Sequence, residues 1–83
     1  MIDVLYFAWV RERIGQGAEQ IELVEGVNTV ETLLNYLRDK GAPYEEALKG
    51  SHLQVAVNQV HADPETPVKD QDEIAIFPPV SGG

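Results

Sequence analysis

The chain has 83 residues, 43% of them hydrophobic, and its 14 acidic and 6 basic residues give a formal charge of −8. This length fits one small domain, and the hydrophobic content is enough for one modest core. The negative charge disfavours a nucleic-acid partner, and the absence of cysteine excludes disulfides, thiolate metal sites and a cysteine nucleophile.

The first part of the chain predicts two strands. Residues 2–10 are apolar and rich in aromatic and β-branched side chains, which is typical of a strand. Residues 11–17 contain two glycines and several polar residues, and predict a loop or hairpin connection. Residues 20–24 alternate between polar and apolar and predict a second strand, which Gly26 ends.

A helix is predicted to follow. Thr29 can cap its N-terminus, or Asn28 can do so together with Glu31. Gly41 and Pro43 end the helical pattern, and residues 44–48 can add one short helical turn. The apolar positions recur at helical spacing and form one stripe: Val30, Leu33, Leu34 and Leu37.

Three further strands are predicted, over residues 53–57, 60–62 and 73–77. The order is therefore β-β-α-β-β-β, with one long helix packed on one face of a sheet, which is an α+β architecture. The first and last strands are the most apolar, so we expect them side by side in the centre of the sheet.

Both faces of these two central strands are apolar, although one helix can cover only one face. Ile2, Val4 and Tyr6 point to one side of the first strand, whereas Leu5 and Phe7 point to the other. One possibility is that Phe7 and Phe77 lie close together in an exposed apolar patch, which would be a partner site. The alternative is that residues 11–17 or 43–50 fold over this face.

The sequence contains no recognisable active site. His52 and His61 have no neighbour at metal-ligand spacing and are interpreted as exposed loop residues. No nucleophile elbow, phosphate-binding loop or dinucleotide fingerprint occurs, and Gly15 and Gly17 are better explained by turn geometry. No segment has the ~20 apolar residues of a membrane span or a signal peptide, so we expect no membrane partner and a cytoplasmic location.

The last residues have the features of a projecting tail. Pro78 and Pro79 cannot donate to a sheet and favour an extended conformation. Residues 78–83 can reach about 20 Å from the domain at roughly 3.3 Å per residue, and Gly82 and Gly83 can enter a narrow channel. The alternative is a tail that is merely frayed, as many termini are.

The segment Phe77-Pro78-Pro79-Val80-Ser81-Gly82-Gly83 resembles the C-terminal signature of the small subunit of molybdopterin synthase. The opening Ile2-Asp3-Val4-Leu5-Tyr6-Phe7-Ala8, followed by Val10-Arg11-Glu12, is also similar to that family. So are Thr29-Val30-Glu31 and Val57-Asn58-Gln59. The resemblance spans the whole chain and implies a ubiquitin-like β-grasp domain over residues 1–77 with a flexible tail over residues 78–83.

The resemblance implies a sulfur carrier without an active site of its own. An E1-like adenylyltransferase would use ATP to adenylate the carboxylate of Gly83, and a persulfide donor would convert it to a thiocarboxylate. The tail, comprising Pro78, Pro79, Val80, Ser81 and Gly82, would insert into the large synthase subunit. There Gly83 would deliver sulfur to cyclic pyranopterin monophosphate within a heterotetramer of two large and two small subunits.

The same resemblance implies docking contacts at Phe7, Phe77 and Arg11, with no metal and no permanently bound cofactor. In the family, an apolar residue stands at the position of His61, which makes His61 a departure from the docking pattern. Two other functions stay open: a carrier for thiazole synthesis or tRNA thiolation, and a non-catalytic ubiquitin-like interaction domain.

Overall fold

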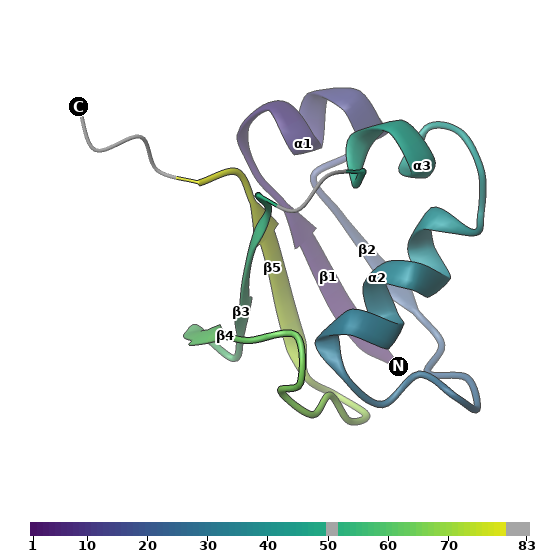
Figure 1. Ribbon diagram of the computed structural model, residues 1–83, viewed down its shortest axis with the longest axis vertical. Coiled ribbons are helices and arrows are strands. Elements are labelled where there is room, and N and C mark those ends of the chain that lie inside the picture. The colour runs from purple at the N-terminus through teal and green to yellow at the C-terminus, as the bar shows by residue number, and fades with distance from the viewer. Residues whose placement is uncertain (50–51, 80–83) are drawn as a thin grey trace.

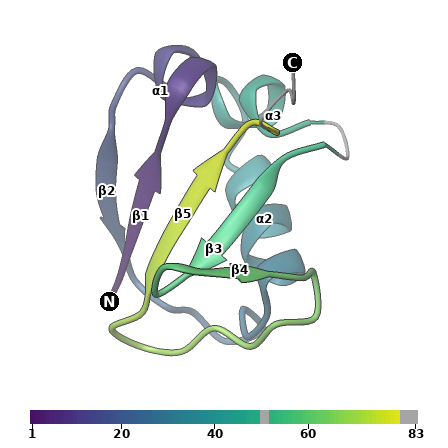
Figure 2. The same ribbon diagram turned by 90° about the vertical axis from the view of Figure 1, so that its left-hand side faces the viewer.

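The computed structural model describes residues 1–49 and 52–79, in which one mixed sheet is packed against helices. The sheet order is β2-β1-β5-β3-β4. Figure 2 shows the sheet in front, α2 and α3 behind it, and α1 across its upper end. The elements in chain order are β1 (Ile2–Tyr6), α1 (Ala8–Ile14), β2 (Ala18–Ile21), α2 (Val30–Arg38), α3 (Tyr44–Ala47), β3 (Gln54–Val57), β4 (Val60–Ala62) and β5 (Glu73–Phe77).

The parallel pair of β1 and β5 occupies the centre of the sheet, as predicted (Figure 1). Val4 lies opposite Ile74 and Tyr6 lies opposite Ile76, and all four side chains are buried on the helix side. The first and last strands of the chain thus meet, while β2 and β3 flank them antiparallel. This arrangement is the ubiquitin-like β-grasp fold that the resemblance implied.

Helix α2 closes the core over the sheet; it begins at the predicted cap and ends at Arg38, three residues before Gly41. Thr29 is the N-cap: its hydroxyl accepts from the backbone N–H of Thr32, and the Thr32 hydroxyl accepts in return from the N–H of Thr29. This reciprocal pair satisfies two N–H groups that have no partner within the helix. Val30, Leu33 and Leu37 are buried, and Leu34 packs partly buried against the core.

The prediction was wrong between residues 7 and 17. The first strand ends at Tyr6, and helix α1 replaces the expected loop. The chain turns at Ala8, whose φ of 54° lies in the left-handed region, and Val10 and Ile14 then bury one helical face. Gly15, with a φ of 92°, ends the helix. Consequently β2 begins at residue 18 and ends at 21, earlier than the predicted 20–24.

A tyrosine–glutamate cluster ties α3 to the sheet. The hydroxyls of Tyr6 and Tyr44 both donate to Oε2 of Glu19, each at 2.7 Å. Burial, and then the bond to Glu19, raise the pKa of both tyrosines above the ordinary value, so both stay protonated donors at neutral pH. Three segments distant in the sequence are thereby joined on the helix side of the sheet.

A second polar network holds the β3–β4 turn against β5. Asp72, the buried charged residue, accepts from the Asn58 side-chain amide and the Lys69 backbone N–H, both at 2.9 Å. The side-chain oxygen Oδ1 of Asn58 accepts from the backbone N–H of Glu73. Asn58 and Gln59 both have positive φ values, 50° and 71°, as the tight two-residue turn requires.

We predict that Glu19→Ala destabilises the fold by about 1–3 kcal/mol, because the buried hydroxyl of Tyr6 loses its acceptor. Urea unfolding at neutral pH measures this change. Glu22→Ala removes an exposed carboxylate from the neighbouring segment and is the matched control. Equal stability of the two variants would contradict a structural role for the cluster.

Candidate docking face and tail root

One face of the sheet is left uncovered by the helices in the described part of the chain. We call it the open face; Figure 2 looks onto it. The strand register aligns one row across all five strands, and this row carries small or apolar side chains except at its last position: Ala18, Leu5, Ala75, Ala56 and His61. The alternative prediction was that residues 11–17 or 43–50 cover this face. In the described residues they do not cover it, because α1 and α3 pack into the core instead.

The rows on either side of this central row differ in chemistry. Towards the start of β1 lies a polar row that contains Gln20, Asp3 and Glu73. Towards the end of β5 lies Phe77, which pairs with Gln54 on β3. The open face is therefore polar at one end and becomes aromatic where the chain leaves the sheet.

Phe7 and Phe77 both lie at this aromatic end, as in the first of the two possibilities that the sequence left open. The backbone N–H of Phe7 donates to the carbonyl of Ile76 at 3.1 Å, which holds Phe7 beside the last strand. Phe7 is 47% exposed and Phe77 is half-buried. An exposed aromatic ring beside a half-buried one gives a partner apolar area that is already held in place. Their role in docking stays a prediction.

Arg11 is separated from Phe77 by the first strand. Its side chain is exposed on α1 and lies against Gly17, where an added β-carbon would be 3.1 Å from the Arg11 Nε. Glycine at position 17 thus permits this close approach. Because Gly17 immediately precedes β2, Arg11 lies on the β2 side of β1, whereas Phe77 lies on the opposite side.

The tail begins directly at the edge of the open face. Strand β5 ends at Phe77, and Pro78 and Pro79 follow outside the sheet, as predicted. The other predicted tail residues, Val80, Ser81, Gly82 and Gly83, lie outside the described residues. The described start of the tail, Pro78 and Pro79, leaves from the aromatic end of the open face.

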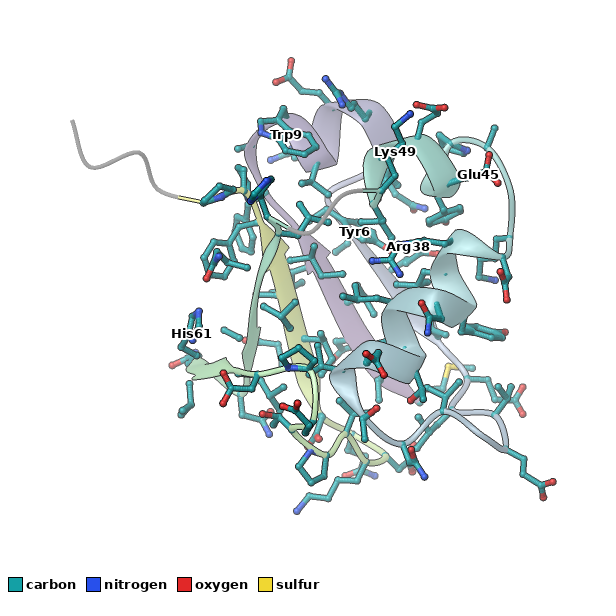
Figure 3. The ribbon with its side chains drawn as sticks, viewed as in Figure 1. Tyr6, Trp9, Arg38, Glu45, Lys49 and His61 are labelled. Carbon is teal, nitrogen blue, oxygen red and sulfur yellow. The ribbon has the colours of Figure 1, made fainter. Side chains whose placement is uncertain are left out.

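Two further side-chain pairs near this surface were missed by the sequence analysis. The Arg13 guanidinium lies 4.7 Å from the centre of the Trp9 ring, and Figure 3 shows Trp9 on α1, at the upper end of the molecule. The i, i+4 spacing of this pair could be recognised only if residues 8–14 were known to be helical. The second pair is His61 and Gln54, whose side chains are 2.6 Å apart on the open face.

The described residues were also searched for groups that could bind a metal ion or a ligand. No group of three or more His, Asp or Glu among them could hold a metal ion.

A groove of about 340 Å³ lies between α2 and the β3–β4 hairpin, on the helix side. Arg38 lines this groove. Its guanidinium donates hydrogen bonds to the carbonyl of Leu48 at 2.8 Å and to the side-chain oxygen of Asn35 at 2.7 Å. None of the helices in residues 1–49 and 52–79 has the length and apolar character to cross a membrane.

Comparisons with known proteins agree with this geometry. The ThiS family model matches residues 4–83. A molybdopterin synthase sulfur carrier subunit from Haemophilus influenzae is 45% identical over 83 residues, covering 100% of both chains. Among solved structures, SAMP1 from Haloferax volcanii superposes with a TM-score of 0.74 at 28% identity, covering 99% of this chain and 98% of that one.

One solved relative is itself a complex. It contains subunits 1 and 2 of the molybdopterin-converting factor from Helicobacter pylori; the matched chain has 29% identity and a TM-score of 0.64, with 99% of this chain and 97% of that chain covered. The resemblance seen in the C-terminal motif is thus supported along the whole length. The chain belongs to the ThiS family and, within it, to the molybdopterin synthase sulfur carrier subunits.

Proposed function

We propose that this protein carries sulfur on the C-terminal carboxylate of Gly83 and delivers it to cyclic pyranopterin monophosphate in the large subunit of molybdopterin synthase. The observation that carries the proposal is the Phe-Pro-Pro-Val-Ser-Gly-Gly segment, which leaves a central strand at the edge of an uncovered apolar face. Its support is the 45% identity over full length to a sulfur carrier subunit.

A carboxylate must be activated before it can accept sulfur, because its oxygen is a poor leaving group. In the proposed reaction, the Gly83 carboxylate attacks the α-phosphorus of ATP in the active site of an E1-like adenylyltransferase. This step releases pyrophosphate and forms an acyl-adenylate. The terminal sulfur of a persulfide donor then attacks the acyl carbon and AMP leaves. A thiol next cleaves the sulfur–sulfur bond, which frees the thiocarboxylate and leaves a disulfide on the donor side.

In these steps, the residues other than Gly83 position the tail and the domain and take no part in the bond changes. Pro78 and Pro79 direct the tail away from β5, and two terminal glycines present the least hindered acyl group to an enclosed site. The open face holds the domain against the partner while the tail reaches inward. The formal charge of −8 favours rapid encounter with a basic surface around a site that receives an anionic tail.

We predict that deleting Gly82 and Gly83 abolishes sulfur transfer while leaving the melting temperature almost unchanged, because the sheet ends at Phe77. Transfer is measured with cyclic pyranopterin monophosphate and the purified large subunit. Binding of the deleted chain to the large subunit is the internal control and should persist. A normal rate of transfer by the deleted chain would exclude Gly83 as the carrier group.

We predict that Phe7→Asp weakens binding to the large subunit by about tenfold or more, because a carboxylate would be buried in an apolar contact. Calorimetric titration measures the Kd. The matched control is Val60→Asp, since Val60 is 69% exposed but pairs with Val57 on the helix side of β3 and β4. Equal weakening by both variants would argue against docking through the open face.

We predict that coexpression with the adenylyltransferase and the persulfide donor increases the mass of the chain by the exchange of one oxygen atom for sulfur. Mass spectrometry of the intact protein measures this directly, with the chain lacking Gly82 and Gly83 as the control. An unchanged mass would favour the non-catalytic interaction domain. A thiocarboxylate that the large subunit cannot use would favour a carrier for thiazole synthesis or tRNA thiolation.

A further inference from the structure

Besides the polar row with Gln20, Asp3 and Glu73, the open face has a polar corner, formed by Gln54 on β3 and His61 on β4. His61 pairs with Ala56 in the register of the hairpin, so both point away from the helices, and Figure 3 shows His61 on the outer side of β4, far from α2. Gln54 pairs with Phe77. The polar corner is therefore continuous with the aromatic end of the proposed docking surface.

The hydrogen bonds of this corner determine the orientation of both side chains. The Gln54 amide nitrogen donates to the carbonyl of His52 at 3.5 Å, which turns the amide oxygen towards His61. In this orientation the oxygen can only accept, so a hydrogen bond across the 2.6 Å to His61 Nε2 requires the tautomer that carries its proton on Nε2. A neutral imidazole carries a single proton, and Nδ1 is then left as a hydrogen-bond acceptor.

An acceptor at the edge of an apolar interface restricts which surface can cover it. An apolar partner surface would bury Nδ1 without a donor, which weakens binding. Charge complementarity indicates which donor is suitable: the chain has a formal charge of −8, so its partner surface is expected to be basic. A lysine or arginine side chain supplies both the positive charge and the N–H group.

We propose that the Gln54–His61 pair is a specificity determinant for the partner: His61 Nδ1 accepts a hydrogen bond from a lysine or arginine of the large subunit, and Gln54 positions the ring. This inference rests on the proposed function, because it assumes that the open face docks on that subunit. Gln54 acts through His61, so its loss should matter only while His61 is present.

The test is a double-mutant cycle on the full chain, measured as Kd for the large subunit of the same organism. At about pH 8, His61→Leu should weaken binding about tenfold or more, because a charged donor loses its acceptor. Gln54→Leu should weaken binding less. The double variant should bind no more weakly than His61→Leu alone.

Val60→Ser is the matched control on the same strand, since Val60 lies on the opposite side and should leave the Kd unchanged. Melting temperatures should stay close to wild type for all variants, because His61 is exposed. Unchanged or tighter binding by His61→Leu would overturn the proposal. A double variant that loses the full product of both single effects would overturn the positioning role of Gln54.

The outcomes also separate this inference from the function on which it rests. If wild type neither binds the large subunit nor transfers sulfur, both proposals fail together. If wild type binds and transfers sulfur while His61→Leu binds equally well, the sulfur-carrier function stands and only the role of the polar corner is lost.

Discussion

The parallel pairing of β1 with β5 is the constraint on which the rest of the structure depends. It brings the first and last strands of the chain together at the centre of the sheet, with Val4 against Ile74 and Tyr6 against Ile76 in the core. Because β5 is central and ends at Phe77, the tail leaves from the middle of the sheet's end. A tail that left from an edge strand would not begin beside Phe7.

The two faces of the sheet differ in what covers them. The helix side is closed by apolar packing and by hydrogen bonds such as those from Tyr6 and Tyr44 to Glu19. In the described residues, no helix packs against the open face. Its aromatic end and its polar corner are therefore available to a partner. An uncovered face of this kind suits the proposed sulfur carrier, whose reactive group would lie on a short terminal segment.

Much of the fold was predictable because its signals are local. The stripe from Val30 to Leu37 and the cap at Thr29 lie within a few residues of each other, and helix α2 begins where they indicate. The segment at residues 7–17 was not predictable in this way. Its turn depends on Ala8 in a left-handed conformation, which alanine rarely adopts and which glycine or asparagine would have signalled. An unbroken apolar run therefore looked like a longer strand.

The sequence by itself determined the chemistry that is available: no cysteine, no catalytic constellation, and a Pro-Pro segment followed by Gly-Gly at the end of an apolar strand. It also indicated that Phe7 and Phe77 could share a surface. Only the tertiary structure decided that the helices leave this surface uncovered and that Arg11 lies on the far side of β1. It also brought His61 to Gln54. These relations depend on strand order and register, which bring together residues far apart in the chain. Spacing along the sequence does not show which of these residues become neighbours.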